Sequence, residues 1–209
     1  MVTWLPAPVA NMSRADISPY LVHFTSGTTY EDAFTRLRKI IADRSLIAGS
    51  RFIKGNYQCV CFSEAPLTSL KGGLVNEDYY SRYSPFGIMV SKQWLFAQGG
   101  RPVIYQPAEE YYSLPESHRW RHVLYQPSDS RESIDFMWER EWRVKCDCLL
   151  FDRSSAQIIV LDQRWADRLI SEHDQEEDYR IVQYRSIFDD DIIVEAYRNS
   201  FQWAVLTLS

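Results

Sequence analysis

Strand-like and helix-like spacings of hydrophobic residues alternate along the chain from residue 20 onward. The run YLVHFT at residues 20–25 is short, apolar and rich in residues that favour strands. After the turn SGTT, hydrophobic residues recur on one helical face: Ala33, Leu37, Ile40 and Ile41. Thr29 followed by Asp32 three residues later is typical of a helix N-terminus. The sequence therefore predicts a first strand and then a helix that ends near Arg44.

Most of the later hydrophobic runs also predict strands. These runs are CVCFSEAPL at 59–67, FGIMV at 86–90, RPVIYQP at 101–107, WEREWRVKCDCLLF at 138–151, AQIIVLD at 156–162 and DDIIVEAY at 190–197. Helices are predicted within SKQWLFAQGG at 91–100 and at QRWADRLISEH, residues 163–173. The polar stretch 107–134 is expected to hold a helix flanked by loops.

The order of these elements predicts a single α+β domain that covers residues 1–209. No internal repeat, low-complexity tract or Pro/Gly linker divides the chain. The strands at about 20–25, 58–63 and 138–146 are expected to share one core, since all three are apolar runs. Residues 150–209 are expected to add a strand–helix–strand extension.

The segment WEREWRV raises the question of why two acids stand among so many aromatic residues. In a continuous strand, Glu139, Glu141 and Arg143 share one face, while Trp138 and Trp142 point to the other face and pack in the core. The acids then form either the solvated face of a half-buried strand or the wall of a pocket that receives a positively charged sugar. The rest of the sequence has to decide between the two interpretations.

Composition narrows the classes of protein that the chain can belong to. The 209 residues are 45% hydrophobic and 24% charged, which is ordinary for a globular protein with a sizeable core. The net charge of −5 argues against a generally basic surface for nucleic acid, although a local basic patch stays open. No apolar run is long enough for a membrane span, and the N-terminus does not resemble a signal peptide. We therefore expect a cytoplasmic protein with no membrane association.

The sequence lacks the motifs of several common catalytic chemistries. The glycines form neither G-x-G-x-x-G nor a phosphate-binding P-loop, and no G-x-S-x-G nucleophile motif is present. His118 and His122 have metal-ligand spacing but lack the glutamate of H-E-x-x-H, so no metal is expected. The cysteines come as two C-x-C pairs and are expected to pack as small hydrophobic residues: Cys59, Cys61, Cys146 and Cys148. Asp189–Asp191 could suggest a nuclease, but three consecutive acids are more typical of a solvated turn.

The motifs LVHFT, VCFSEAPL, GIMVSKQW, PVIYQP and WEREWRV, in this order, resemble the AbiGi-like abortive-infection family and its relatives of unknown function. The resemblance covers residues 20 to about 145. More distantly, the same order resembles the ADP-ribosyltransferase superfamily, including the DarT-like toxins. The chain lacks the S-T-S motif and the clean middle-strand tyrosine of the best-known subgroups of that superfamily.

The resemblance to ADP-ribosyltransferases implies a split β-sheet core around an NAD⁺ cleft. In that superfamily a His or Arg lies on the first strand, a Ser or aromatic residue on a middle strand, and a catalytic Glu on a late strand. His23, Ser63 and Glu141 occupy these places here. Glu141 is thus the expected catalytic residue at the ribose, and Glu139 is expected to face the acceptor. The NAD-binding residues implied are His23, Thr25, Arg51, Ser63 and Tyr83.

The residue types suit cleavage of the nicotinamide–ribose bond. This reaction passes through an oxocarbenium-like state, which a carboxylate beside the ribose stabilises. In NAD⁺ the nicotinamide is already a pyridinium and leaves as a neutral molecule, so no strong general acid is needed. On this interpretation His23 anchors the adenosine side of NAD⁺. Tyr79, Tyr80 and Tyr83 are the candidates for stacking on nicotinamide.

Two functions remain open at this stage. One is an NAD-dependent ADP-ribosyltransferase of a bacterial abortive-infection or toxin–antitoxin defence system, which transfers ADP-ribose to a nucleic acid or protein acceptor. The other is a non-catalytic antitoxin or interaction module of the same fold, bound to a partner protein from a neighbouring gene. Convergence of His23, Ser63 and Glu141 around one cleft would favour the enzyme.

Overall fold

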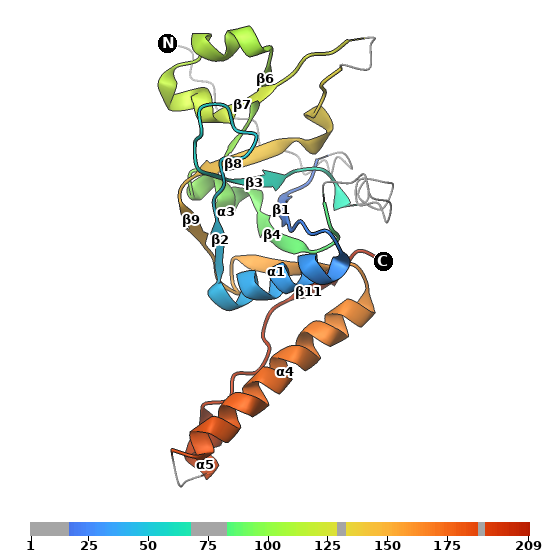
Figure 1. The fold of residues 1–209 in the computed structure, drawn as a ribbon, viewed down its shortest axis with the longest axis vertical. Coiled ribbons are helices and arrows are strands. Elements are labelled where there is room, and N and C mark those ends of the chain that lie inside the picture. Colours follow the sequence, from blue (N-terminus) through green and yellow to red (C-terminus); the bar gives the residue numbers. More distant parts are fainter. Residues whose placement is uncertain (1–16, 68–82, 129–132, 188–190) are drawn as a thin grey trace, which may run out of the picture.

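The computed structural model describes residues 17–67, 83–128, 133–187 and 191–209. A seven-stranded sheet in the order β11-β10-β4-β1-β3-β8-β5 forms its centre (Figure 1). Neighbouring strands of this sheet are antiparallel except β10 and β11, which are parallel. Two small sheets pair β2 with β9 and β6 with β7. The chain is thus an α+β protein with a mostly antiparallel sheet.

The strands are β1 (Tyr20–Phe24), β2 (Ser45–Ile47), β3 (Cys59–Ser63), β4 (Gly87–Ser91), β5 (Arg101–Pro102), β6 (Ile104–Gln106), β7 (His122–Leu124), β8 (Glu141–Lys145), β9 (Cys148–Leu150), β10 (Ala156–Val160) and β11 (Val205–Thr207). The α-helices are α1 (Tyr30–Asp43), α3 (Lys92–Ala97), α4 (Gln163–Arg185) and α5 (Asp191–Ala196). Short 3₁₀ helices are η2 (Ala108–Ser113), η3 (Glu116–Arg121) and η4 (Met137–Glu139). No helix within these described ranges has the length and apolar character of a bilayer span.

The first strand–helix unit forms as its sequence predicts. The backbone N–H of Asp32 donates to Thr29 Oγ1 at 3.1 Å, which satisfies a donor that the first helical turn leaves free. Arg44 ends α1 in the left-handed conformation, with its N–H bonded to the carbonyl of Ile40. Ala33, Phe34 and Leu37 are buried against the sheet. Local capping and spacing therefore suffice to explain α1.

The sheet has two faces with different coverings. On the first, which we call the α1 face, α1, α3 and the start of α4 cover a large apolar core that includes Leu21, Val60, Phe62, Ile88, Val90, Trp142, Val144, Ile158 and Val160. The second, which we call the Glu141 face, holds two smaller clusters: Val22, Phe24, Met89, Ile159 and Leu208 in one, and Ile53, Cys59 and Trp120 in the other. Directly paired residues of antiparallel strands have their side chains on the same face, and side chains alternate between faces along each strand. The strand register therefore assigns each sheet residue to the α1 face or to the Glu141 face.

The sheet is nearly divided between β1 and β3. These strands share a single register pair, Val22 with Ser63, whereas β1 with β4 and β3 with β8 each share five. His23 reaches into this seam, where its Nδ1 donates to the carbonyl of Cys61 at 2.8 Å. Figure 1 shows β3 and β8 grouped above β1 and β4. The sheet thus consists of two halves, β11-β10-β4-β1 and β3-β8-β5, joined by one register pair, by the His23 hydrogen bond and by the apolar core that they share on the α1 face.

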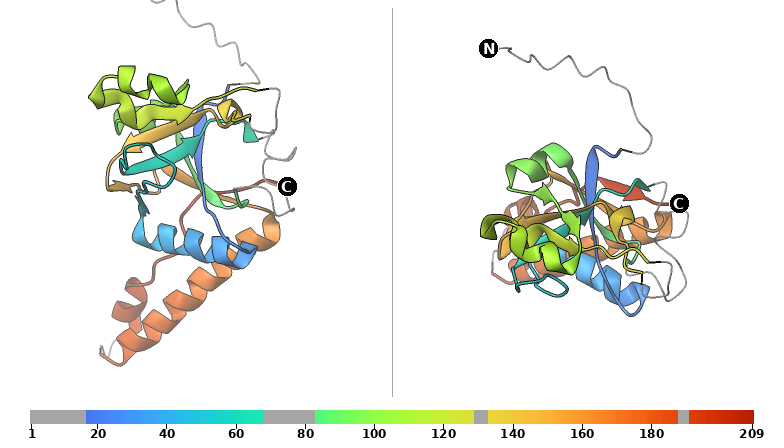
Figure 2. Two further views of the ribbon diagram at one scale, coloured as in Figure 1. Left: turned by 45° about the horizontal axis from the view of Figure 1, so that its top comes forward. Right: turned by 90° about the horizontal axis from the view of Figure 1, so that it is seen from above.

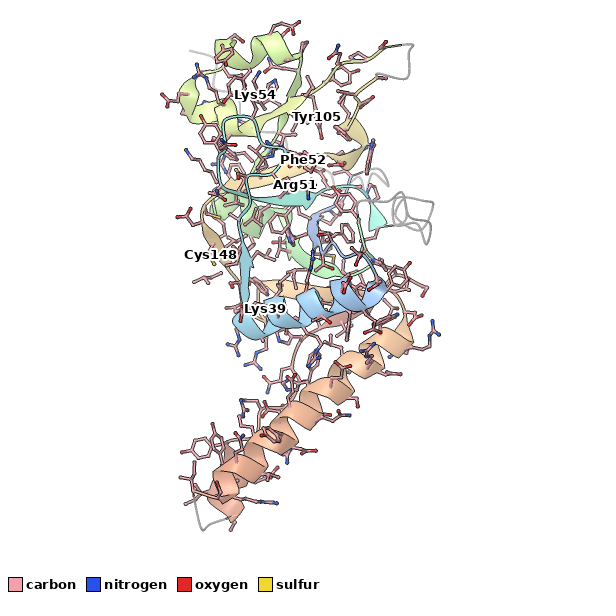
Figure 3. The ribbon with its side chains drawn as sticks, in the orientation of Figure 1. Lys39, Arg51, Phe52, Lys54, Tyr105 and Cys148 are labelled. Carbon is pink, nitrogen blue, oxygen red and sulfur yellow. The ribbon has the colours of Figure 1, made fainter. Side chains whose placement is uncertain are left out.

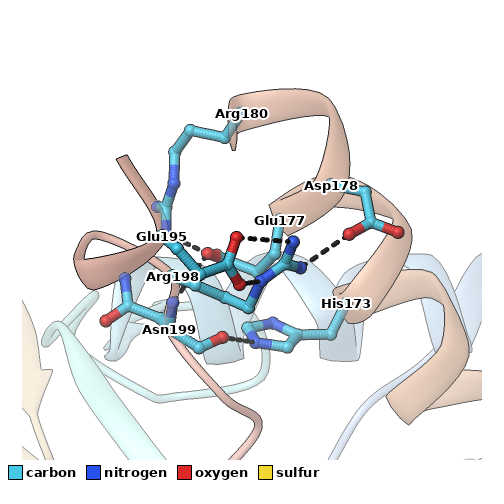
Figure 4. A network of polar contacts seen from close by, with 7 residues as sticks. All are labelled: His173, Glu177, Asp178, Arg180, Glu195, Arg198 and Asn199. Atoms are coloured by element: carbon cyan, nitrogen blue, oxygen red, sulfur yellow. Dashed lines mark hydrogen bonds and ion pairs between the residues drawn. The ribbon is translucent and has the colours of Figure 1, made fainter. Parts of the chain in front are cut away.

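A helical arm, made of α4, α5 and the return segment to Ala204, leaves the body between β10 and β11. Figures 1 and 2 show α4 running away from the sheet with α5 at its far end. Inside the arm, the buried carboxylate of Glu177 pairs with Arg180 and accepts from the backbone N–H of Asn199 at 2.9 Å (Figure 4). Arg198 pairs with Asp178 and Glu195 in the same network. These contacts hold the return segment against α4.

Three predicted elements are wrong in detail. Residues 138–146 are not one strand, since η4 ends at Glu139, Arg140 takes the left-handed conformation at φ 45°, and β8 begins only at Glu141. Residues 191–196, predicted as strand, form α5, whose Val194 is fully buried. Over its described residues, 107–128 and 133–134, the stretch 107–134 holds two 3₁₀ helices and β7 in place of the predicted helix.

Candidate functional site

Glu141 and Ser63 lie directly opposite each other on β8 and β3, and both belong to the Glu141 face. Arg143, two residues further along β8, shares that face and holds the Glu141 carboxylate with two hydrogen bonds. Its Nε donates to Oε1 at 2.8 Å and its Nη2 donates to Oε2 at 3.2 Å. The third nitrogen, Nη1, donates to the carbonyls of Trp120 and His122. This fork geometry fixes the carboxylate in one orientation.

Glu139 lies beside this pair although it is not in the strand. The residue is buried, and its carbonyl accepts a hydrogen bond from Ser63 Oγ at 2.7 Å. The same hydroxyl oxygen accepts from the backbone N–H of Ala65 at 3.1 Å. Ser63 therefore anchors the η4 turn on the end of β3. The anchored turn brings the second acid to the same face as Glu141.

Two tyrosines complete the surroundings of the acids. The hydroxyl of Tyr83 bonds to the Glu139 side chain, and burial, together with the charge of Glu139, raises the pKa of Tyr83. The Tyr83 ring contacts Phe24 at 5.4 Å and Trp138 at 6.4 Å between centroids. Tyr105 Oη accepts from the backbone N–H of Glu141 at 3.1 Å, and burial raises its pKa to about 12. Both hydroxyls therefore stay protonated near neutral pH.

We call Ser63, Tyr83, Tyr105, Glu139, Glu141 and Arg143 the carboxylate cluster. Cys61 borders it, and burial followed by the charge of Glu141 raises the pKa of this thiol. A thiol with a raised pKa stays protonated, which makes it a poor nucleophile. The chemistry that the cluster can offer is that of an oriented carboxylate in partly buried, aromatic surroundings.

His23 does not belong to the carboxylate cluster. It pairs with Ile88 in the register and contacts the Phe62 ring at 5.8 Å, and both of these residues lie on the α1 face. Burial lowers the pKa of His23, and its hydrogen bond to the Cys61 carbonyl opposes that shift. His23, Ser63 and Glu141 therefore do not converge on one cleft in this structure, because the strand register places His23 on the opposite face.

Two further predicted residues also stand outside the cluster. Thr25 is buried and donates its hydroxyl to the carbonyl of Phe86 at 3.1 Å, a contact that fastens the end of β1. Arg51 lies in the exposed loop before β3, with its guanidinium 4.8 Å from the centre of the Phe52 ring. Ser63, Tyr83, Glu139 and Glu141 are thus the predicted site residues that the fold brings together. Tyr79 and Tyr80 lie outside the described residues.

The sequence did not identify the roles of Arg143 and Tyr105. Arg143 could have been found from its spacing, since E-x-R on one strand face places a cation beside the acid. Tyr105 carries no local signal, because β6 reaches Glu141 only through the tertiary fold. The two tryptophans of this segment differ: Trp142 is 8% exposed and packs in the core as predicted, whereas Trp138 is 42% exposed.

Neither a metal cluster nor the main described cavity coincides with these acids. Within the part of the chain that the structure describes, no three His, Cys, Asp or Glu side chains are placed to hold a metal ion. A cavity of about 680 Å³ lies elsewhere, at the edge of β4 and β10, where Tyr20, Trp94 and Asp152 contribute to its wall.

Fold and site together define an α+β protein whose mostly antiparallel sheet is nearly split, with paired carboxylates on one face beside the split. Comparisons with protein-family models, with curated proteins and with solved structures find no match to this chain.

Proposed function

We propose that this protein is an NAD-dependent ADP-ribosyltransferase-like enzyme of a bacterial abortive-infection or toxin–antitoxin type defence system, with a nucleic acid or protein acceptor. The observation that carries the proposal is the position of Glu141. It begins β8, opposite Ser63 and beside Glu139, and Ser63 is the β3 residue at the single register pair that joins β3 to β1. A late-strand glutamate beside a split sheet is what the resemblance to ADP-ribosyltransferases implies.

The electrostatics of the carboxylate cluster support this chemistry. The developing ribosyl cation needs a negative charge that is already oriented, because reorganisation at the moment of reaction costs energy. Arg143 holds Glu141 by two hydrogen bonds and is itself held by two backbone carbonyls. Arg143 is thus a positioning residue in the proposal, while Glu141 contacts the ribose and Glu139 faces the acceptor.

The remaining predicted residues take different places in the proposal. Tyr83, next to Glu139 and edge-on to Trp138, is the stacking candidate that lies within the described residues. His23 bridges the seam through the Cys61 carbonyl, so it would position the two sheet halves that flank the NAD⁺ site. Thr25 and Arg51 have no contact with the carboxylate cluster and receive no role in binding NAD⁺.

The proposal predicts that Glu141→Gln keeps NAD⁺ binding and loses turnover. Removing one preorganised electrostatic group costs a factor on the order of 10²–10³ in rate. The measurement is NAD⁺ hydrolysis, with and without acceptor, on samples that thermal unfolding shows to be folded. Asp174→Asn removes an exposed acid from α4 and serves as the control, with wild-type turnover expected. Equal turnover in wild type and Glu141→Gln would refute the catalytic role.

Two observations favour the alternative, a non-catalytic antitoxin or interaction module. His23 lies on the face opposite Ser63 and Glu141, so these three residues do not converge on one cleft. Both carboxylate oxygens of Glu141 are bonded to Arg143, and the Ser63 hydroxyl is bonded to backbone groups, as in a purely structural network. Calorimetry and thermal shift with NAD⁺ separate the two functions. NAD⁺ at about 100 times its dissociation constant stabilises a binding protein by about 2.7 kcal/mol. Absence of any shift at millimolar NAD⁺ would favour the module.

A further inference from the structure

Basic side chains lie over aromatic rings at the end of the molecule opposite the helical arm. The pairs, with the distance from the cation to the ring centre, are Arg51 on Phe52 at 4.8 Å, Lys54 on Tyr111 at 4.5 Å and on Tyr112 at 5.3 Å, Arg119 on Tyr111 and Tyr112 at 5.7 Å each, and Lys145 on Tyr57 at 4.9 Å. Figure 3 shows Arg51, Phe52 and Lys54 together above the sheet. We call these eight residues the cation–aromatic patch.

The cations of the patch differ in their ion pairing from the cations near the helical arm. Within the described residues, no carboxylate lies within ion-pair distance of any of the four. Near the arm, by contrast, Arg38, Arg168, Arg180 and Arg198 each pair with a carboxylate. Glu109, Glu110 and Glu116 are exposed on the neighbouring 3₁₀ helices and moderate the positive charge. The patch is a local concentration of unneutralised cations on a chain of net charge −5.

Two rings of the patch are presented to solvent. Phe52 is 77% exposed and Tyr112 is 71% exposed. Phe52 also takes the left-handed conformation at φ 65°, which is unfavourable for a bulky side chain and common for Gly or Asn. Backbone strain of this kind is concentrated at functional sites. Both rings are therefore accessible to a ligand.

The patch is also built rigidly. Lys54 Nζ donates to the Ala108 carbonyl at 2.9 Å, and Arg119 Nε donates to the Leu114 carbonyl at 3.1 Å. Gly55, at φ 90°, lets the loop approach η2 so closely that an added Cβ would meet Tyr111 Oη at 2.4 Å. Preorganised groups lose less conformational entropy when a ligand binds. The arrangement of charges and rings is therefore present before any ligand arrives.

We propose that the cation–aromatic patch binds single-stranded nucleic acid. The cations would contact phosphates, and unstacked bases would stack on Phe52 and Tyr112, which is the usual combination in proteins that bind single strands. A duplex hides its base faces and would leave both rings unused. An acidic peptide would satisfy the cations and leave the rings without a partner.

The patch lies close enough to the carboxylate cluster for a bound strand to reach it. Lys145 and Glu141 are on the same face of β8, four residues apart, which corresponds to about 13 Å. The carbonyl of Trp120 in η3, the helix that also carries Arg119, holds Arg143. The proposal that the patch binds nucleic acid does not depend on catalysis. The proposal that the patch holds the ADP-ribose acceptor rests on the proposed function.

The test measures fluorescence anisotropy of labelled 12-mers of single-stranded DNA, single-stranded RNA and the matching duplex, without NAD⁺. We expect at least one single strand to bind more tightly than the duplex, and the two single-stranded arms identify which nucleic acid it is. Phe52→Asn suits the left-handed backbone and removes the ring, so it should fold and weaken binding about 5- to 100-fold. Lys145→Gln should lower the salt slope of log K by about 0.7.

Phe96→Ala is the matched control, because Phe96 is an exposed ring with Arg101 over it at 3.9 Å but lies on α3. It should bind like the wild type. No binding of either single strand, tighter binding of the duplex, or equal affinity of Phe52→Asn and wild type would overturn the proposal. These results leave NAD⁺ turnover untouched, so the patch and the transferase can fail separately.

Discussion

At the scale of single residues, the most consequential contact is the buried pair of Arg143 and Glu141. Both side chains are almost fully shielded, with 5% and 13% of their surface exposed. A buried pair adds little stability compared with a hydrophobic pair, but removal of one partner leaves an uncompensated charge. The pair therefore makes the stability of the sheet depend on two neighbouring groups of the proposed site.

Arg143→Met should destabilise the protein by about 3–5 kcal/mol, because Glu141 is left buried without its partner. Urea unfolding measures the change. Adding Glu141→Gln to this variant should restore at least about 1 kcal/mol, since the stranded charge is gone. Arg164→Gln, at an ion pair whose arginine is 87% exposed, is the control, with an effect of no more than about 1 kcal/mol. A double variant no more stable than Arg143→Met would contradict this account.

His23 should make stability depend on pH in a specific window. Burial lowers its pKa from the ordinary 6.5. The unfolded chain then binds more protons than the folded one between the lowered pKa and 6.5, so stability is full above pH 6.5 and falls as pH decreases through that window. The slope is at most about 1.4 kcal/mol per pH unit for one proton. Unfolding midpoints measured from pH 7.5 to 5 test this pH dependence of stability.

His23→Asn is the control for this pH dependence, because its amide can still donate to the Cys61 carbonyl but does not titrate. Its stability should change less between pH 7.5 and 5 than that of the wild type. Carboxyl groups with lowered pKa values, such as Asp152 and Asp162, titrate at lower pH and do not interfere in this range. Equal slopes in the two proteins would exclude His23 as the source.

At the scale of elements, local chemistry decided which predictions succeeded. The helix α1 has its cap, its acidic first turn and its apolar spacing within one short segment, so the sequence contains all the information needed. The segment 138–146 does not contain this information locally, since its 3₁₀ turn is held by Ser63, which is 76 residues away in sequence. The β-branched run before Val194 favours a strand, but packing against α4 overrides that propensity.

Thr29→Ala should lower the free energy of unfolding by about 1 kcal/mol, because the N–H of Asp32 loses its acceptor at the start of α1. Thr35→Ala is the matched control, since Thr35 is exposed within the same helix and alanine favours helix. Thermal or urea unfolding of the two variants tests the pair. If Thr35→Ala is the more destabilising change, the assigned cap is wrong.

The candidate site also contains a residue whose position the local sequence could not predict. Alternation along a strand placed Glu141 and Arg143 on one face, because the side-chain period of a strand is two. Which face His23 shares was beyond the sequence, since that depends on the register between β1, β3 and β4. A shift of one residue in this register would move the His23 side chain from the α1 face to the Glu141 face, beside the carboxylates.

At the scale of the whole molecule, the narrow seam between β1 and β3 divides the sheet into two units. Each half has its own register pairs, whereas the halves share one. Regions with few shared contacts open as separate cooperative units. The proposed NAD⁺ site lies at the boundary of these units, so it would combine two parts of different local stability.

Val60→Ala removes two buried carbons from β3, at a cost of about 2 kcal/mol including the cavity. Amide hydrogen exchange should then speed up in β3 and β8 more than in β4 and β10, because the two halves open separately. Val90→Ala in β4 should produce the reverse pattern. Uniform acceleration across all four strands in both variants would show that the sheet opens as one unit.

The parallel pairing of β10 with β11 has a consequence for how this protein can vary. Parallel neighbours need a crossover of about a dozen residues, and the helical arm is far longer, with α4 alone spanning about 35 Å. The arm leaves from one strand and returns to the adjacent one, so its ends stay fixed whatever its length. Relatives could therefore lengthen, shorten or exchange the part of this crossover beyond Glu176 as a cassette, and chimeras that swap it should retain the sheet and its carboxylates, because the start of α4 stays packed on the core.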